Sequence, residues 1–209
     1  MTTEGIRNII FDLGGVIIDI DTRLAFQELS SYYQGHKSAE GLFSENAGLF
    51  LDFEKGLITA AEFREGIRKL TENAELSDQQ IDDAWNRMLL KIPEERFAVL
   101  EKIRPHYQLY VLSNTNAIHV PAFNQIVKQT SGKEGIGHYF DKVYFSHEMQ
   151  KRKPDSEIYQ QLLEECLLKP AETIFIDDRR ENIDAAASLG MRVFHVTPEQ
   201  GIVDFFDEA

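Results

Sequence analysis

Four short apolar runs constrain the fold of this 209-residue chain more than any other feature. They lie at residues 8–13, 107–112, 173–176 and 192–196, and residues 143–146 are a candidate for a further run of this kind. Each run is almost continuously apolar, which is typical of strands that are buried on both faces of a parallel sheet. We therefore predict an α/β fold.

Helical patterns separate the later runs. Residues 154–167 open with Pro and Asp, and residues 180–189 end at Gly190, both of which are helix-boundary signals. The alternation of strands and helices predicts a doubly wound, Rossmann-like parallel sheet. The acidic tail at residues 204–209 is expected to be a frayed end.

The interval between the first two runs is different, because it contains helical patterns and no convincing strand. Capping-box sequences begin at Thr59 and at Ser77. Apolar residues recur at helical spacing after each, and we assign them to packing between helices, with contact to a substrate as the alternative: Phe63, Ile67, Leu70, Ile81, Trp85, Met88 and Leu89. We predict a Rossmann-like core of residues 1–18 and 97–209, interrupted by an all-helical domain at residues 19–96.

The composition argues against several classes of function. The net charge of −13 opposes binding to nucleic acid or to an anionic membrane, because both depend on clustered Lys and Arg. No apolar stretch is long enough to span a bilayer, and no signal peptide is expected. The single cysteine, Cys166, excludes an intrachain disulfide. We expect a cytoplasmic protein, and no feature of the sequence specifies an oligomeric state.

Polar residues gather where the predicted strands end, which is where ligands bind in an open parallel sheet. Asp12 follows the first run, residues 113–116 (Ser-Asn-Thr-Asn) follow the second, and Asp177-Asp178 follows the third. Residues 151–154 (Lys-Arg-Lys-Pro) precede a helix. Each group alone has an ordinary explanation as a cap, a turn or a solvated surface. Together they predict one site, in which Asp12 is suited to be a nucleophile or a metal ligand.

This pattern resembles the haloacid dehalogenase superfamily of phosphatases. Its four motifs are matched by Asp12-Leu13-Gly14-Gly15-Val16, by Ser113, by Lys153-Pro154 and by Asp177-Asp178. The resemblance covers essentially the whole chain, since this family places a helical cap where residues 19–96 are inserted. The chain is most similar to bacterial phosphatases that act on glucose 1-phosphate, and it is also similar to the phosphatase domain of soluble epoxide hydrolases.

The resemblance implies a catalytic role for three residues. Asp12 would attack phosphorus and form an aspartyl-phosphate, Ser113 would donate to a phosphoryl oxygen, and Lys153 would neutralise charge between them. The expected substrate is a small phosphorylated metabolite, with a sugar phosphate as the first candidate. Substrate contacts are expected from the neighbouring polar residues Asn114, Thr115 and Arg152.

The resemblance also implies a Mg²⁺ ion as cofactor. Its ligands would be the carboxylates of Asp12 and Asp178 and the backbone carbonyl of Gly14, with Asp177 binding directly or through water. Asn182 would orient this metal-binding loop. The function implied is Mg²⁺-dependent phosphatase activity.

Gly14 departs from the family pattern, because the family carries a second Asp there as the general acid and base. Such acid–base help is worth about 10²–10⁴-fold in rate. The substrate could have a leaving group that departs readily, such as an anomeric sugar phosphate, an acyl phosphate or an anhydride. Another side chain could instead replace the missing Asp, and the candidates are Asp19, Asp21, His36, Glu45 and Glu54.

Two further alternatives stay open. Catalysis could be lost, leaving a phosphometabolite-binding or protein-interaction module. Hydrolytic dehalogenation also lacks an Asp at position 14, but it needs no metal, so the Asp177-Asp178 pair counts against it. Within residues 41–56, the side chains of Glu45, Asn46 and Glu54 could bind sugar hydroxyls or could be solvated surface residues.

Overall fold

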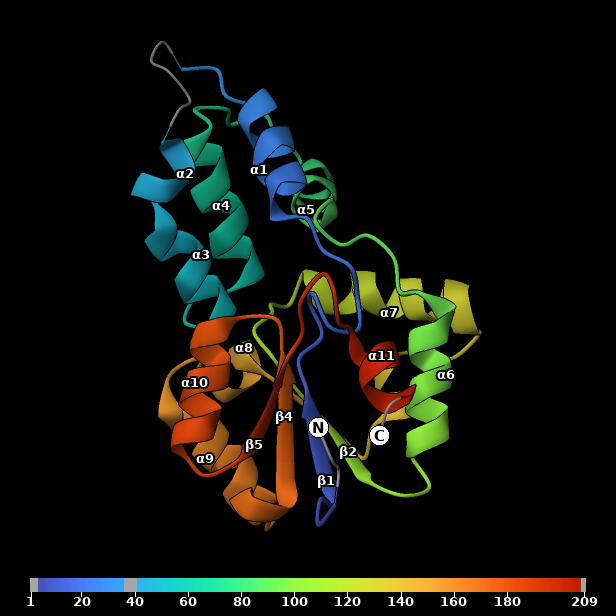
Figure 1. Ribbon diagram of the computed structural model, residues 1–209. Helices are drawn as coiled ribbons and strands as arrows, with labels where there is room; N and C mark the ends of the chain where they lie inside the picture. The colour runs from blue at the N-terminus through green and yellow to red at the C-terminus, as the bar shows by residue number, and fades with distance from the viewer. Residues whose placement is uncertain (1–3, 36–40, 208–209) are drawn as a thin grey trace.

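The computed structural model describes residues 4–35 and 41–207. In this part of the chain, one sheet contains five parallel strands in the order β3-β2-β1-β4-β5 (Figure 1). The strands are Asn8–Phe11 (β1), Gln108–Ser113 (β2), Lys142–Phe145 (β3), Thr173–Asp177 (β4) and Arg192–His195 (β5). The prediction of an α/β fold with a doubly wound parallel sheet is confirmed.

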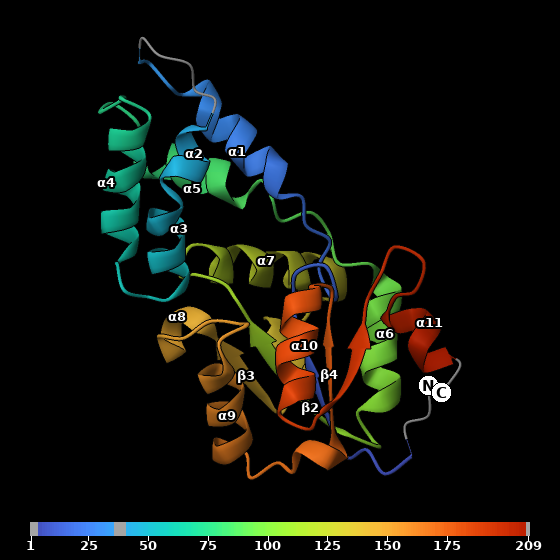
Figure 2. The same cartoon turned by 60° about the vertical axis from the view of Figure 1, so that its left-hand side comes forward.

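Helices cover both faces of this sheet (Figures 1 and 2). Glu94–Ile103 (α6), His119–Ser131 (α7) and Ile202–Asp207 (α11) pack on one face, and Ser156–Glu165 (α9) and Arg180–Ser188 (α10) pack on the other. The chain runs outward from β1 to β3 and then returns to β4 on the other side of β1. Because crossover connections are right-handed, this reversal places the two sets of helices on opposite faces.

The two cores beside the sheet follow from the alternation of side chains along buried strands. Ile9 and Phe11 of β1 lie in the core under α6, α7 and α11, while Ile10 lies in the core under α9 and α10. Since neighbouring residues of a strand point to opposite faces, a continuously apolar strand fills both cores.

The C-terminal segment corrects one prediction. Residues 204–207 do not fray, because they belong to α11, and the side chains of Phe205 and Phe206 are only 3% and 5% exposed. The Phe205 ring stacks on Phe194 of β5 with centroids 4.2 Å apart. The apolar residues of this tail outweigh its acidic ones, since burial of each aromatic side chain contributes about 1.5–3 kcal/mol.

The described part of the segment between β1 and α6 contains helices and loops and adds no strand to the sheet. Its helices are Thr22–Ser31 (α1), Leu42–Glu45 (α2), Ala47–Glu54 (α3), Ala60–Leu70 (α4) and Asp78–Asn86 (α5). Both predicted capping boxes are present, with Thr59 and Glu62 at the start of α4 and Ser77 and Gln80 at the start of α5. The capping boxes fix where these helices begin, because their side chains accept hydrogen bonds from backbone N–H groups that have no partner within the helix.

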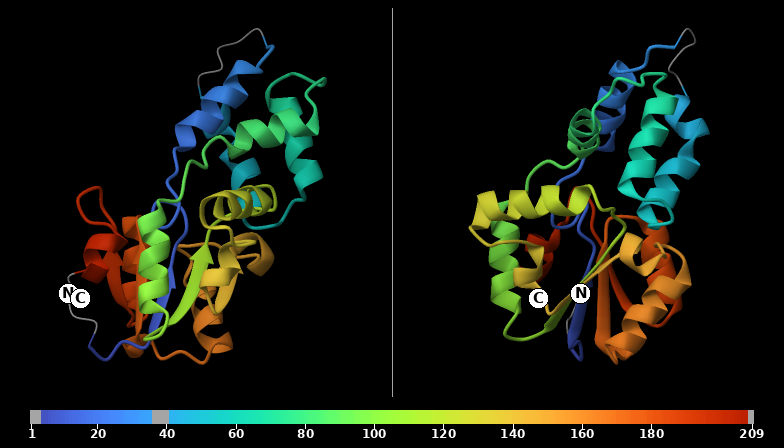
Figure 3. Two further views of the ribbon diagram at one scale, coloured as in Figure 1. Left: turned by 90° about the vertical axis from the view of Figure 1, so that its right-hand side faces the viewer. Right: turned by 180° about the vertical axis from the view of Figure 1, so that it is seen from behind.

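The helical region (α1–α5) has a core of its own. Phe63, Ile67 and Ile81 are fully buried in it, and Trp85 and Met88 are buried in the same cluster. Most of the predicted packing residues are therefore buried, while Leu70 and Leu89 are partly buried against the same cluster. Figure 3 shows α7 running across beneath this region, between it and the strands.

Several contacts seat the helical region on the rest of the molecule. The Ser146 hydroxyl, at the start of α8 (Ser146–Met149), donates to the carbonyl oxygen of Glu54 at 2.6 Å. Lys55 forms an ion pair with Asp155 at 3.4 Å. Gly56 comes so close that a Cβ there would lie 2.0 Å from the backbone oxygen of His147. The helical region thus meets the core at the end of α3.

Candidate active site

The register of the sheet brings the first two candidate residues together. Phe11 of β1 lies beside Ile176 of β4, so Asp12 and Asp177 occupy neighbouring positions at the carboxyl edge of the sheet. The Asp12 N–H continues the ladder by donating to the Ile176 carbonyl at 2.9 Å. With Asp178, each of these residues offers one carboxylate oxygen, and the three oxygens lie within 4.8 Å of one another.

Lys153 lies among these carboxylates. Its Nζ is 3.0 Å from Oδ1 of Asp12 and 2.6 Å from Oδ2 of Asp177, and its side chain is fully buried. The side-chain amide of Asn114 holds the Lys153 backbone from both sides, accepting from its N–H and donating to its carbonyl, each at 2.9 Å. We call Asp12, Lys153, Asp177 and Asp178 the charged cluster.

Asp177 is the most enclosed member of the charged cluster. Its Oδ1 accepts from the Arg179 N–H at 2.8 Å and from the Asn182 amide at 2.9 Å. Its Oδ2 accepts from Lys153 and, at 3.0 Å, from the same Asn182 amide. Each oxygen thus has two hydrogen bonds already, so this carboxylate is better placed to orient Lys153 than to bind a ligand.

The charged cluster carries an excess of negative charge. Burial raises the pKa of Asp12 to about 7; Lys153 opposes this rise, and the charges of Asp177 and Asp178 add to it. Burial and then Asp177 also raise the pKa of Asp178. Burial alone would lower the pKa of Lys153, but the Asp12 and Asp177 carboxylates together raise it above its ordinary value. Three acids therefore share one buried cation.

This donor set fits a small, hard divalent cation. Carboxylate oxygens are the ligands that Mg²⁺ prefers, and a cation would relieve the repulsion that raises the pKa of Asp12 and of Asp178. The loop after β1 lies against the same place: Gly15 has a φ of +73°, and a Cβ there would be 2.3 Å from Oδ2 of Asp178. A side chain at position 15 would displace that carboxylate, so both conformation and space call for glycine.

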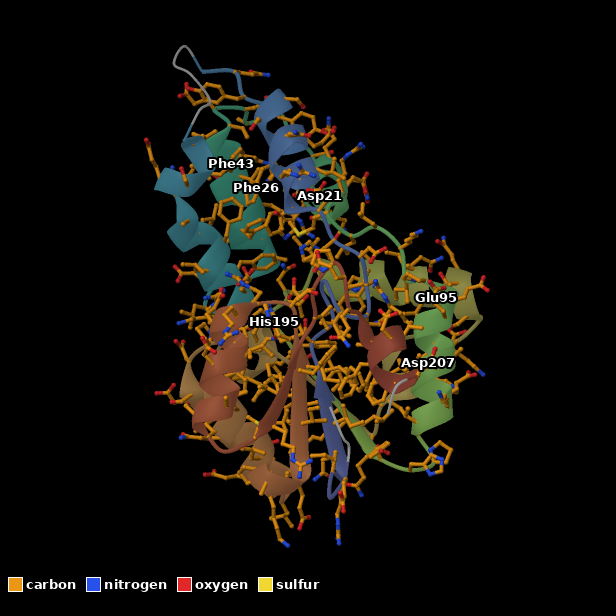
Figure 4. The ribbon with its side chains drawn as sticks, viewed as in Figure 1. Asp21, Phe26, Phe43, Glu95, His195 and Asp207 are labelled. Atoms are coloured by element: carbon orange, nitrogen blue, oxygen red, sulfur yellow. The ribbon has the colours of Figure 1, made fainter. Side chains whose placement is uncertain are left out.

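A cavity of about 290 Å³ opens onto Asp12, Lys153 and Asp178. Its other side is apolar and comes mainly from the helical region. One of its residues, Phe26, is labelled in Figure 4. We call this side the aromatic wall, and its residues are Phe26, Phe50, Trp85, Met88 and His119. The enclosed space thus has a charged side and an apolar side, which suits a ligand with a phosphate at one end.

The other predicted site residues lie around this cavity in different ways. Asn114, Thr115 and Arg152 line it, as does Gly14. Ser113, the last residue of β2, is 3% exposed and is not among the lining residues.

Some polar atoms of these lining residues already form hydrogen bonds within the protein. The Ser146 hydroxyl, which donates to Glu54, accepts from the Thr115 N–H at 2.9 Å, and its oxygen lies 3.0 Å from the Thr115 carbonyl oxygen. Arg152 donates to Glu54 at 3.2 Å. Since the amide of Asn114 is also bonded to the Lys153 backbone, the structure gives Asn114 and Thr115 internal contacts that sequence reasoning did not foresee.

The five candidates for the missing acid separate clearly. Glu54 lines the cavity, where it pairs with Arg152. Asp19 pairs instead with Arg96 at 2.9 Å, and Asp21 caps α1 and binds Arg23, so neither lines this cavity. Glu45 borders a separate hollow between α3 and α4, and His36 lies outside the described residues.

Sequence reasoning missed His119, the first residue of α7. It assigned no role to any histidine, yet His119 is only 6% exposed and lines the cavity. Its position just after the Ser113–Asn116 loop was the available signal, because that loop follows β2 into the site. The Asn116 side chain caps the turn by accepting from the N–H of Ile118 and of His119, both at 3.1 Å.

A larger cavity, of about 690 Å³, lies at the amino ends of the strands and is lined in part by Asn8, Gln108 and Lys169. It contains none of the residues that the sequence singled out. Ligands of open parallel sheets bind at the carboxyl ends, so the smaller cavity is the functional candidate. No helix within the described ranges is long and apolar enough to cross a membrane.

Comparison with known proteins was consistent with this geometry. Residues 6–190 match the family described as haloacid dehalogenase-like hydrolase. The D-ribitol-5-phosphate phosphatase of Bacteroides thetaiotaomicron is 31% identical over 196 residues, covering 94% of this chain and 93% of that protein.

Solved structures are similar over nearly the whole chain. A haloacid dehalogenase family enzyme of Bacteroides thetaiotaomicron, in complex with magnesium and inorganic phosphate, has a TM-score of 0.84 and 37% identity, covering 96% of this chain and 99% of that one. A hydrolase of the same kind from Porphyromonas gingivalis has a TM-score of 0.85 and 30% identity, covering 97% of each chain.

Proposed function

This chain belongs to the haloacid dehalogenase-like hydrolases and is a phosphatase, and we propose that it hydrolyses the phosphoric monoester of a small sugar or polyol. The observation that carries the proposal is the meeting of Asp12, Lys153 and Asp178 on one side of an enclosed cavity with an apolar opposite side. The similarity to a D-ribitol-5-phosphate phosphatase supports a polyol as the alcohol part of the substrate. Similarity to the glucose-1-phosphate and epoxide-hydrolase groups stays a prediction.

In the proposed reaction, Asp12 is the nucleophile. A carboxylate oxygen of Asp12 forms a bond to phosphorus while the bond from phosphorus to the alcohol oxygen breaks, and that oxygen takes up a proton. Water then attacks phosphorus, which releases inorganic phosphate and returns the Asp12 carboxylate. Lys153, 3.0 Å from Asp12, offsets the repulsion between the carboxylate and the phosphate.

We propose Mg²⁺ as the cofactor, held by Asp12, Asp178 and the backbone carbonyl of Gly14. When bound, the ion neutralises negative charge on the phosphoryl group and on the carboxylates. Asp177 acts as a positioning residue for Lys153, because both of its oxygens are occupied by hydrogen bonds. Ser113 is retained as a donor to a phosphoryl oxygen, and Arg152 as a substrate contact.

The helical region fits the role of a cap over this chemistry. It supplies most of the aromatic wall, and closing it over the charged cluster excludes water. We propose residues 19–96 as the cap and residues 1–18 and 97–209 as the catalytic core. Phosphorylated metabolites are held inside cells, so we propose a cytoplasmic location.

Because Gly14 cannot act as the acid and base, the departure of the leaving oxygen has two possible explanations. The substrate could need little help because its alcohol departs readily, or Glu54 could assist, since it is the candidate that lines the cavity. The alternative of a non-catalytic binding module draws on Gly14 alone, and the presence of Asp12, Lys153 and Asp178 together at one cavity counts against it.

Phosphate release tests this function directly. Sugar phosphates, polyol phosphates, nucleotides and acyl phosphates are supplied with and without Mg²⁺ to the wild-type protein, to Asp12→Asn and to Asp52→Asn. Asp12→Asn should lower turnover at least ~10⁴-fold, because it removes the nucleophile. Asp52→Asn makes the same chemical change at an exposed position of α3 and should leave turnover unchanged. Equal activity of Asp12→Asn and wild type would overturn the mechanism, and activity confined to nucleotides or acyl phosphates would overturn the substrate class.

A further inference from the structure

The aromatic wall contains polar atoms that lack partners. Across residues 4–35 and 41–207, the buried side-chain nitrogens without a hydrogen bond are Trp85 Nε1, His119 Nε2, His147 Nδ1 and Arg152 Nε. Three of these four residues, namely Trp85, His119 and Arg152, line the cavity that opens onto Asp12. A buried polar atom without a partner is destabilising, so their gathering at one cavity points to a ligand that supplies the partners.

The hydrogen bond on the other side of the ring determines what His119 Nε2 can do. Its Nδ1 lies 2.7 Å from Oδ1 of Asn86, at the end of α5. An amide oxygen can only accept, so Nδ1 carries the proton and Nε2 is left with a bare lone pair. Burial also lowers the pKa of His119 to about 3, so the ring is neutral at pH 7. Nε2 is therefore a hydrogen-bond acceptor.

An acceptor at this position does not match a phosphate group. The oxygens of a phosphoric monoester at neutral pH are themselves acceptors, and a neutral ring offers them no charge. The partner of His119 Nε2 has to be a donor on the alcohol part of the substrate, and for a sugar or polyol that donor is a hydroxyl. Trp85 offers the complementary N–H, and its ring stacks on His119 with centroids 5.2 Å apart and planes 16° apart.

We propose that His119 Nε2 accepts a hydrogen bond from a hydroxyl of the substrate's alcohol moiety, and that Trp85 Nε1 donates to an oxygen of the same moiety. This pair would make the enzyme select monoesters of polyhydroxy alcohols over those of plain alcohols. The inference rests on the proposed function and adds to it the side chains that bind the hydroxyl groups of the substrate. The discrimination comes from the cost of leaving buried polar atoms unpaired when a substrate without hydroxyls binds.

The test compares substrates that differ in hydroxyls and variants that differ in acceptors. Ribitol 5-phosphate and n-pentyl phosphate have the same chain length, and 4-nitrophenyl phosphate reports on the chemistry without any hydroxyl. His119→Phe keeps a ring against Trp85 and removes the acceptor. His147→Phe is the matched control, because His147 is partly buried, also has a buried nitrogen without a partner and stacks on Phe145, but does not line the cavity.

We expect wild type to prefer ribitol 5-phosphate to pentyl phosphate in kcat/KM, and His119→Phe to reduce that preference about 10- to 100-fold. Turnover of 4-nitrophenyl phosphate should fall less than that of ribitol 5-phosphate, because this substrate has no hydroxyl to donate to Nε2. His147→Phe should keep the preference of wild type. Trp85→Phe, which keeps an aromatic ring in the wall, should reduce the preference by a smaller factor.

Several results would overturn the inference. A loss that is equal for all three substrates would show that His119 has only a structural role, and an unchanged preference would show that water satisfies Nε2. A wild-type enzyme without preference would overturn it even if His119→Phe does not fold. Failure of the proposed function looks different, because the wild type would then hydrolyse other phosphates and neither sugar nor polyol phosphates.

Discussion

The charged cluster and the aromatic wall face each other across one cavity, yet they are built in opposite ways. In the charged cluster, Asp177 has two hydrogen bonds on each oxygen, and Lys153 pairs with Asp12 and Asp177. In the aromatic wall, Trp85 Nε1 and His119 Nε2 have no partner. A side chain that takes part in the reaction is best held rigidly by other protein groups. A side chain that recognises the substrate needs a polar atom that can bond to it.

The two sides also draw on different parts of the chain. The charged cluster comes from strand ends and the loops that follow them, so the sheet positions it. The aromatic wall combines α1, α3 and α5 with the first residue of α7, so it exists only when the helical region lies over the sheet. Substitutions on the first side should therefore abolish the reaction, and those on the second should change its selectivity.

The largest effect is expected at Lys153. Lys153→Met leaves the buried carboxylates of Asp12 and Asp177 without their cation, so the free energy of unfolding should fall by about 3–5 kcal/mol. Turnover should fall with it, since the charge facing the phosphate is lost. Urea unfolding and phosphate release measure both quantities. Lys91→Met, at an exposed position, is the matched control, and equal stability of the two variants would contradict the role of the charged cluster.

A smaller effect is expected at His119 of the aromatic wall, in the pH dependence of the free energy of unfolding. The folded state holds His119 neutral down to about pH 3, whereas the unfolded chain protonates it near pH 6.5. Below pH 6.5 the unfolded state therefore binds more protons, and stability is lost as pH falls from 6.5 towards 3, by up to about 1.4 kcal/mol per pH unit. His119→Phe should show a shallower loss between pH 6.5 and 4.5 in urea unfolding. The exposed His106, changed to Phe, should keep the wild-type slope, and identical slopes for all three proteins would refute the prediction.

The smallest effect is expected at Gly14, where the two sides meet. Gly14→Asp restores the family's usual acid and base, and we expect turnover of simple alkyl phosphates to rise about 10-fold, more than that of sugar 1-phosphates. A Cβ at position 14 would lie 3.1 Å from Cδ1 of Ile20, so that flexible side chain must shift slightly. Gly14→Asn matches the volume without the acid and should show no gain. Equal gains on both substrate classes would count against a bias towards good leaving groups.

The charged cluster was predictable because Asp12, Asp177 and Asp178 each follow a recognisable strand, while Lys153 stands just before a predicted helix. Asp12 and Asp177 come directly at the ends of continuously apolar runs, and parallel strands place their carboxyl ends at one edge. Register then makes them neighbours, as the pairing of Phe11 with Ile176 shows.

The errors share a different cause. Residues 204–207 were expected to fray, but Phe205 and Phe206 pack against the core as part of α11. Of the four described candidates for the missing acid, Glu54 lines the cavity, while Asp19 and Asp21 are paired elsewhere. In each case the local sequence was ambiguous, and the outcome depended on which distant surface the side chain meets.

By itself, then, the sequence determined the α/β fold, the capped helices between the first two strands and the strand-end residues of the charged cluster. These depend on periodicity and on neighbours in the chain, which any parallel sheet converts into proximity. Only the tertiary structure decided that Trp85 and His119, 34 positions apart, stack on the cavity that opens onto Asp12 with their nitrogens unpaired. The physical reason is that the seating of one helical layer on another depends on the packing of many side chains at once, which no local pattern encodes.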